Sequence, residues 1–233
     1  MLGKSSRFFN AGYVVPKFQL VLREETIFSL STRSFEKYFK SEAFLFLVRK
    51  DYESKSFVAA EVNKLGIKDY RIIEFSSETR GQADSVFIGL RNYHDDVPLL
   101  IFNIDTIRYN FCYPLAKDTG DGFLEVFKGE GENWSFIEPG AGTSVLRTTE
   151  KERISDLCSN GLYFFSRTTD FREAFDSYIS SGNQVQGELY VAPLYNYLIL
   201  HGRDIRYQLV ESSLINHCGT PEDYERLKLH NYF

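Results

Sequence analysis

Residues 44–75 read FLFLVRKDYESKSFVAAEVNKLGIKDYRIIEF, and this stretch decides the fold class. The apolar run 44–48 has the length of a buried strand, and 71–75 is typical of a second one. Between these two runs, the spacing predicts a helix over 51–64 that stops at Gly66. Strand, helix and strand in succession predict a parallel pair of strands joined by a crossover helix.

The same alternation continues on both sides of this stretch. Apolar residues at helical spacing predict a helix within 25–39. After the second strand come a polar loop over 76–81, a short helix over 82–91 and an apolar strand over 98–104 that ends before Asp105. The first half therefore predicts an α/β fold, in which helices cover both faces of a mostly parallel sheet.

The middle of the chain has a different pattern. Short predicted strands separated by glycines indicate an antiparallel excursion, at 120–127, 134–138 and 145–149, and a further strand is expected at 162–166. One α/β domain that carries a β-rich substrate lobe is the simplest account of this pattern.

Two helices and a strand are expected in the last third. Asp170 is the predicted N-cap of the first helix, and Glu173 would complete a capping box. The second helix is predicted over 191–199 and ends at Gly202, and a strand follows over 205–210.

Composition argues against several classes of protein. The 233 residues are 43% hydrophobic and 25% charged, which is typical of a globular chain that folds without a disulfide or metal. With 27 basic and 32 acidic residues, the net charge of −5 argues against a strongly basic nucleic-acid binder and leaves only a local basic patch open. The three cysteines form no CxxC pair and the four histidines lack metal-ligand spacing, so neither a zinc ribbon nor a disulfide framework is expected.

No membrane or secretory segment is expected. The apolar runs 43–48 and 97–102 are far shorter than the roughly 18 residues that a membrane helix needs. Ser5, Ser6 and Arg7 interrupt the N-terminus before an apolar signal region can form. We therefore expect a cytoplasmic protein.

The N-terminal segment is the first with recognisable chemistry. Residues 3–7 read GKSSR, and Pro16-Lys17 follows. Small residues let backbone N–H groups approach phosphate oxygens, and Arg7 and Lys17 could add positive charge. Taken alone, such a segment is more typical of a flexible chain end.

The order of further motifs strengthens the phosphate interpretation. After this loop, the chain carries ETRGQA at 78–83, Asp105 after a strand, Glu150-Lys151 with Ser155, GLYFF at 161–165, GELY at 187–190 and GTPED at 219–223. This ordered series resembles the sugar-phosphate nucleotidylyltransferases, most of all their small capsule and surface-polysaccharide branch. The resemblance covers nearly the whole chain, and it rests on the order and spacing of the motifs.

The resemblance implies a fold and an activity. It implies one domain over 1–233 with a Rossmann-like, mostly parallel mixed sheet flanked by helices and a small antiparallel substrate lobe. Residues 1–110 would form the nucleotide-binding half and 111–233 the acceptor-binding half. The implied enzyme is a nucleotidyltransferase that moves NMP from an NTP to a sugar phosphate or other phosphorylated acceptor, releasing pyrophosphate for surface-polysaccharide precursors. Its cofactor would be Mg²⁺, with no nucleic acid or membrane as partner, and a homo-oligomer is left open.

The resemblance also implies roles for residues of the nucleotide half. The loop residues Gly3, Ser5 and Ser6 would cradle the triphosphate, with Arg7 at the loop's end and Lys17 on the phosphates. Ser5 stands where the family usually has a further glycine, so its Cβ could crowd the phosphate while its hydroxyl could donate to it.

The base and the metal are assigned by the same resemblance. Gly81 would let the base approach the backbone, with Gln82 beside it. Asp105 matches the carboxylate that holds a magnesium ion. Many relatives have a second metal-binding Asp just before the C-terminal Gly-Thr. Here NHC at 216–218 holds that place, and the nearest carboxylates are Glu222 and Asp223, of which Asp223 is taken as the second metal ligand.

The resemblance assigns Glu150, Lys151 and Glu188 to the binding of the acceptor. Lys151 would contact the acceptor phosphate, and Glu188 would bind acceptor hydroxyls. A phosphate monoester is already largely anionic near pH 7, since its second pKa is about 6. The reaction therefore needs no general base, and catalysis reduces to positioning and charge neutralisation.

Each assignment has a plainer alternative that the sequence leaves open. Asp105 could cap a turn, and Gly81 could be an ordinary turn glycine. Glu150 and Lys151 could be solvated surface charges, and Glu188 could be a carboxylate at a helix N-terminus.

Two other functions also stay open. In the family an apolar strand precedes the glycine-rich loop, whereas this sequence begins at Met1 inside that loop, so the first central strand is expected either upstream or to be missing. A catalytically impaired nucleotide-binding homologue with a regulatory or structural role is therefore the alternative. A glycosyltransferase of similar fold ranks last, because residues 105–107 read DTI and not DxD.

Overall fold

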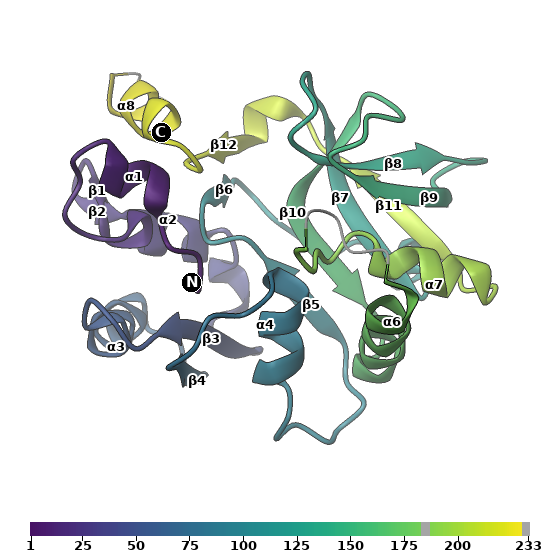
Figure 1. Cartoon of the computed structure of the whole chain (residues 1–233), viewed down its shortest axis with the longest axis horizontal. Helices are drawn as coiled ribbons and strands as arrows, with labels where there is room; N and C mark the ends of the chain where they lie inside the picture. Colours follow the sequence, from purple (N-terminus) through teal and green to yellow (C-terminus); the bar gives the residue numbers. More distant parts are fainter. Residues whose placement is uncertain (183–186, 230–233) are drawn as a thin grey trace. The chain divides into compact units, whose positions relative to one another are not determined.

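The computed structural model describes residues 1–182 and 187–229, which form two compact units (Figure 1). Unit 1 contains Met1–Glu78, Asn103–Cys112 and the segment from Leu214 onward, and unit 2 contains Thr79–Phe102 and Tyr113–Ser213. Each unit contains segments from both of the predicted halves 1–110 and 111–233, so its boundaries differ from those of the halves. The functional roles of those halves remain a prediction.

Unit 1 is built on the parallel pair that the sequence predicts. Strand β3 (Ala43–Arg49) pairs in parallel with β4 (Asp69–Phe75), and α3 (Ser54–Leu65) connects them and packs on both. Gly66 ends α3 in the left-handed conformation, with φ of 76°, which glycine adopts without the strain of a side chain. The predicted strand–helix–strand unit is therefore confirmed.

The other N-terminal elements of unit 1 are short. The predicted helix within 25–39 is present as α2 (Ile27–Arg33), which Thr26 caps by accepting from the Ser29 N–H, followed by the 3₁₀ turn η2 (Glu36–Tyr38). Before it lie η1 (Lys17–Gln19), β1 (Val21–Leu22) and β2 (Glu25–Thr26). Helix α1 (Ser6–Asn10) begins inside the segment that the sequence predicts as a loop, and its buried Phe8 packs against Tyr13 and Tyr224.

Strands β6 (Thr106–Arg108) and β12 (Ile215–His217) of unit 1, like β1 and β2, have no counterpart in the sequence prediction. Strand β6 pairs antiparallel with β12, and helix α8 (Pro221–Leu229) follows. This pairing brings Asp105, just before β6, next to the segment that follows β12.

Unit 2 contains a six-stranded mixed sheet (Figure 1). The strand order is β11-β7-β10-β8-β9, with β5 also paired to β10, and only β11 and β7 run parallel. The strands are β5 (Leu99–Phe102), β7 (Gly122–Lys128), β8 (Ser135–Pro139), β9 (Val145–Glu150), β10 (Leu157–Phe165) and β11 (Ile205–Leu209). The expected α/β class is confirmed as a mixed sheet with flanking helices and smaller antiparallel pairs.

Helices of unit 2 cover this sheet. They are α4 (Gln82–Gly89), α5 (Ala116–Thr119), α6 (Thr168–Ser181) and α7 (Leu194–Leu200), and the 3₁₀ turn η3 (Ser212–Leu214) follows β11. Helix α6 packs on β10, α4 and α7, and α7 packs on β9 and β11. Within the described residues, no helix is both long and apolar enough to cross a bilayer.

The predicted start of α6 is wrong in its detail. Arg167, not Asp170, is the N-cap residue, and it makes no side-chain capping bond. Asp170 lies inside the first turn, fully buried, where it accepts from Arg167 at 2.6 Å and from Arg203 at 3.1 Å. The carboxylate is therefore used to join α6 to the chain beyond α7, because a buried charge needs such partners.

Candidate active site

An ion pair between Lys17 and Asp105 is the centre of the candidate site in unit 1. The Lys17 Nζ lies 2.5 Å from Asp105 Oδ2, and both side chains are about three-quarters buried. Buried Pro16 precedes η1 and places Lys17 at its start, while the Asp105 carbonyl accepts from the Cys218 N–H at 2.7 Å. The main chain thus holds both charged residues from either side.

The charge on Asp105 is stabilised by its surroundings. Burial alone would raise the pKa of this carboxyl, but the Lys17 ammonium and the hydrogen bonds to the carboxylate outweigh burial and hold the pKa below its ordinary value. Asp105 is therefore an anion at neutral pH. It does more than cap a turn, which was the plainer alternative.

The N-terminal loop is joined to Lys17 through Ser5. Ser5 has a positive φ of 52° and its hydroxyl accepts from the Lys17 backbone N–H at 3.2 Å. Ser6 and Arg7 lie in the first turn of α1 and are exposed to solvent, as is Gly3. The structure thus connects the two segments that the sequence assigns to phosphates, with Gly3, Ser6 and Arg7 facing water beside them.

Asp223 lies in the first turn of α8. Its Oδ2 accepts from the Thr220 hydroxyl at 3.0 Å, and its Oδ1 faces the Arg226 guanidinium at 3.2 Å. The pKa of nearby His217 is lowered by burial, against the opposing effect of Asp105 and Asp223. Among the described residues, no three His, Cys, Asp or Glu side chains are grouped to hold a metal.

The side chains in unit 1 fit a magnesium site that has few protein ligands. Mg²⁺ is usually bound by one or two carboxylates, with water and substrate phosphates completing its shell. Asp105 offers one ionised carboxylate whose present partner is the Lys17 ammonium. Such a site is completed by the phosphates of a substrate, and it needs no cage of protein ligands.

In unit 2, Gly81 allows two backbone segments to approach closely. Its φ is 137°, and a Cβ at this position would lie 2.5 Å from the Leu189 carbonyl oxygen and 2.7 Å from the Leu189 nitrogen. The Leu189 N–H donates to the Arg80 carbonyl at 2.6 Å, and the Ala83 N–H donates to the Leu189 carbonyl at 3.0 Å. Gly81 is therefore more than a turn glycine, because it joins the segment of Gln82, the first residue of α4, to that of Leu189.

Glu150 is a buried carboxyl and not a solvated surface charge. It ends β9 with 8% of its surface exposed, and the Ser135 hydroxyl donates to it. The hydroxyls of Ser135 and Tyr163 lie 3.3 Å apart. Burial raises the pKa of Glu150 above its ordinary value, although Ser135 and Lys151 act against this, and burial together with Glu150 raises the pKa of Tyr163 to about 12.

Lys151 and Glu188 are brought together by Tyr190. The Lys151 Nζ donates to the Tyr190 hydroxyl at 2.6 Å and lies 4.9 Å from the centre of its ring. The Tyr190 hydroxyl in turn donates to Glu188. Glu188 lies in an extended segment before α7, so the alternative of a helix N-terminal carboxylate is wrong.

Tyr190 is the functional candidate that sequence reasoning missed. The motif GELY at 187–190 was noted, but no role was assigned to its tyrosine. The available signal was spacing, because residues two apart in an extended segment project to the same side.

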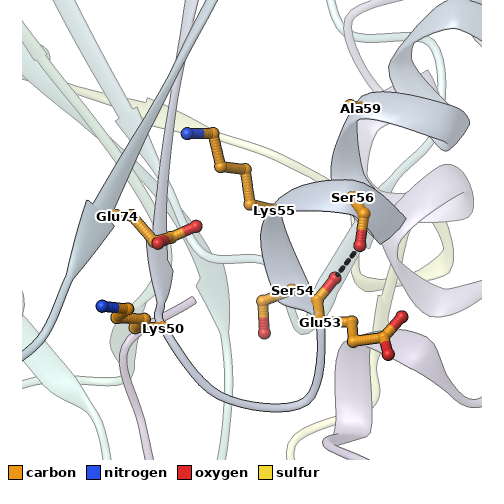
Figure 2. Close-up of a pocket in the computed structure, with 7 residues that line it drawn as sticks. All are labelled: Lys50, Glu53, Ser54, Lys55, Ser56, Ala59 and Glu74. Carbon is orange, nitrogen blue, oxygen red and sulfur yellow. Dashed lines mark hydrogen bonds between the residues drawn. The ribbon is translucent and has the colours of Figure 1, made fainter.

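A cavity of about 460 Å³ lies elsewhere in unit 1, and Figure 2 shows the seven side chains that line it. They come from the loop after β3, from the first turns of α3 and from β4, and they are Lys50, Glu53, Ser54, Lys55, Ser56, Ala59 and Glu74. Two lysines and two glutamates leave the cavity without net charge, and none of the predicted site residues lines it. It is therefore not the candidate active site.

The predicted residues thus form one group in each unit. Unit 1 holds the residues assigned to phosphates and metal, namely Gly3, Ser5, Ser6, Arg7, Lys17, Asp105 and Asp223. Unit 2 holds those assigned to base and acceptor, namely Gly81, Gln82, Glu150, Lys151 and Glu188.

Comparison with known proteins identifies the family. No family model and no curated protein matches the chain. Among solved structures, the nucleoside-diphosphate-sugar pyrophosphorylase from Vibrio cholerae RC9 is 45% identical, with 99% of this chain and 98% of that chain covered and a TM-score of 0.95.

More distant structures share the fold. A Bacillus anthracis protein described as a glucose-1-phosphate thymidylyltransferase, in complex with sucrose, is 15% identical over 97% of this chain and 91% of its own, with a TM-score of 0.77. The inositol-1-phosphate CTP transferase from T. maritima has the same identity and coverages, with a TM-score of 0.71. Identity at the level of the Vibrio protein, over the whole length of both chains, shows that this chain belongs to the nucleoside-diphosphate-sugar pyrophosphorylases and is a nucleotidyltransferase.

Proposed function

We propose that the enzyme transfers NMP from an NTP to a sugar phosphate or another phosphorylated acceptor and releases pyrophosphate, in the synthesis of surface-polysaccharide precursors. The observation that carries this proposal is the full-length match to the Vibrio pyrophosphorylase at 45% identity. The charged groups in both units support it, because each has the chemistry that one of the two substrates requires. Residues 1–110 would serve mainly the nucleotide and 111–233 the acceptor.

The triphosphate would bind at the N-terminal loop of unit 1. Backbone N–H groups around Gly3, Ser5 and Ser6 can approach phosphate oxygens, and the Ser5 hydroxyl already contacts the main chain of Lys17. Exposed Arg7 adds a guanidinium that can bind two oxygens at once. Lys17 would exchange its contact with Asp105 for the phosphates as they bind.

The metal would be held by Asp105. When bound there, Mg²⁺ would supply positive charge to offset the negative charge that develops as pyrophosphate leaves. The low pKa of Asp105 keeps its carboxylate ionised and available for that ion. Asp223, which already accepts from Thr220 and faces Arg226, would act as a second ligand in competition with those partners.

The base and the acceptor would bind unit 2. Gly81 and Gln82 would lie beside the base, where the glycine leaves the backbone uncovered. Lys151 would contact the acceptor phosphate, and Glu188 and Glu150 its hydroxyls. The acceptor oxygen is already anionic near neutral pH, so these residues act by orienting it for in-line attack on the α-phosphorus.

A catalytically impaired nucleotide-binding homologue is the second candidate. The observation that favours it is Asp223, because both of its oxygens are engaged in the first turn of α8. Residues 216–218 read NHC, whereas the family resemblance implies an Asp in this segment. Such a protein would bind nucleotide and release no pyrophosphate.

A pyrophosphate-release screen separates the two. Each of the four NTPs is incubated with Mg²⁺ and a panel of sugar and polyol phosphates. Release that requires both an NTP and an acceptor supports the enzyme. Nucleotide binding without release from any pair supports the impaired homologue, and neither binding nor release contradicts both.

A further inference from the structure

The phenol of Tyr190 lies between two opposite charges of unit 2. It accepts from the Lys151 ammonium at 2.6 Å and donates to the Glu188 carboxylate. Within the described residues, no ion pair joins Lys151 directly to Glu188. A neutral hydroxyl therefore connects a cation and an anion that would otherwise attract each other.

The hydrogen-bonding capacity of the three groups explains what this bridge achieves. An ammonium has three N–H donors and a carboxylate about four lone-pair sites, whereas a phenol has one O–H and an acceptor oxygen. Tyr190 occupies one donor of Lys151 and one acceptor site of Glu188. The phenol thus orients both charged groups through one hydrogen bond to each.

We propose that Tyr190 is a positioning residue for the acceptor. It keeps Lys151 and Glu188 separate and oriented, so that the cation can receive a phosphate and the carboxylate a hydroxyl of the same molecule. This inference rests on the proposed function, since it assumes that these two residues bind the acceptor. The class of ligand is thus a hydroxylated phosphate monoester.

The fold places all three residues through the main chain. Lys151 has a positive φ of 56°, and its N–H donates to the Trp134 carbonyl at 2.9 Å. On the other side, the backbone of Leu189, between Glu188 and Tyr190, bonds to Arg80 and Ala83. The backbone next to Tyr190 and that of Lys151 are both held by hydrogen bonds. The position of the phenol therefore does not depend on the side chains of Lys151 and Glu188.

The charge state of the phenol agrees with this role. Burial, together with the hydrogen bond to Glu188, raises the pKa of Tyr190 above its ordinary value. The hydroxyl therefore keeps its proton, and its donor bond to Glu188, across the neutral range.

Loss of the Tyr190 hydroxyl could affect Lys151 and Glu188 in two ways. Without the phenol oxygen, Lys151 and Glu188 can turn toward each other, and a direct ion pair would have to open before an acceptor binds. Alternatively, each side chain becomes less ordered, and the acceptor must then order it. Both outcomes weaken acceptor binding and leave the nucleotide residues of unit 1 unchanged.

Tyr190→Phe tests the proposal, because it removes only the hydroxyl and keeps the ring below Lys151. With the acceptor that gives wild-type turnover, we expect the acceptor KM to rise about tenfold, as for loss of a hydrogen bond to charged groups. The NTP KM should change less than about twofold. Tyr207→Phe is the matched control, since the hydroxyl of this β11 tyrosine also donates a hydrogen bond, to the Gly142 carbonyl at 3.4 Å, and lies among no predicted site residues.

The double variant Glu188→Gln/Tyr190→Phe shows whether Tyr190 acts through its neighbours. If it does, the double variant raises the acceptor KM by less than the product of the two single effects. An unchanged acceptor KM in Tyr190→Phe, or equal rises in both substrates' KM values, would overturn the inference while wild-type turnover upholds the proposed function. No pyrophosphate release by the wild type with any substrate pair would overturn both.

Discussion

At the scale of single residues, the Lys17–Asp105 pair is the most informative contact. The Lys17 ammonium lies 2.5 Å from the Asp105 carboxylate and balances its negative charge. Under the proposed function, the metal and the triphosphate would take over that role when they bind. Replacing the carboxylate should therefore affect the metal-dependent reaction far more than the fold.

Asp105→Asn should reduce Mg²⁺-dependent pyrophosphate release by about a hundredfold or more, because a bound metal contributes several kcal/mol to catalysis. Steady-state rates against Mg²⁺ concentration check this, with Asp156→Asn as a surface control whose carboxylate is 58% exposed. Wild-type rates in Asp105→Asn would remove this carboxylate from the metal site.

Lys151→Ala should raise the acceptor KM and also lower kcat, reducing kcat/KM for the acceptor by about tenfold to a hundredfold. A point charge facing a dianionic phosphate acts on both the bound acceptor and the transition state. The matched control is Lys128→Ala, whose side chain is 69% exposed. A change confined to NTP affinity would place Lys151 on the other substrate.

The pKa of buried Glu150 predicts a pH dependence of stability. Because the folded-state pKa is raised, folding is favoured by this group below its unfolded pKa, and that contribution is lost as pH rises through the folded pKa. Glu150→Gln keeps an acceptor for Ser135 but cannot ionise. Its Tm, relative to wild type, should therefore increase from pH 4 to pH 7.

Thermal melts of Glu150→Gln and wild type across this pH range provide the measurement. Glu138→Gln, at a carboxylate that is 40% exposed, serves as the control and should show no comparable rise. A difference that stays flat or falls with pH would show that Glu150 is not destabilised by burial.

At the scale of elements, the helices and strands that could be predicted are those with a strong local sequence pattern. The strand–helix–strand unit of β3, α3 and β4 follows from apolar runs and a stop glycine, both of which act within the segment itself. Strands β6 and β12 could not be predicted in this way, because each has three residues and exists through its distant partner. The N-cap of α6 was misplaced because Asp170 has partners from Arg203, far away in sequence.

The same distinction applies to the site. The order of the motifs indicated the family resemblance. The resemblance then supplied the candidate residues, which are the loop glycines, the strand-end carboxylates and the Glu-Lys pair. The bridge through Tyr190 could not be predicted, because it depends on Lys151 approaching Tyr190 from a distant part of the chain.

Gly81→Ala tests the close approach between the start of α4 and Leu189. The new Cβ would lie 2.5 Å from a carbonyl oxygen and φ is 137°, so we expect a loss of about 2–4 kcal/mol in unfolding free energy. That loss corresponds to a Tm lower by roughly 4 °C or more. Thermal melts provide the check.

Gly142→Ala separates steric overlap from backbone strain. Gly142 also has a positive φ, 63°, but no atom lies within 4 Å of its added Cβ, so its Tm should fall by less. Equal losses in the two variants would mean that the contact with Leu189 contributes nothing.

At the scale of the whole molecule, two units each supply one kind of chemistry. Unit 1 carries the cationic loop and the Asp105 carboxylate, and unit 2 carries the Lys151–Tyr190–Glu188 group. Under the proposed function, the residues of unit 1 would bind the triphosphate and the metal, and those of unit 2 would bind the base and the acceptor.

The central claim is that the α-phosphorus of an NTP is transferred to an acceptor phosphate. The most direct test follows an α-labelled NTP with Mg²⁺ and a sugar phosphate. The account predicts label in a nucleoside-diphosphate sugar, formed in equal amount to pyrophosphate and reversed by added pyrophosphate. Label that stays in the NTP, or that appears as free NMP without need of an acceptor, would contradict it.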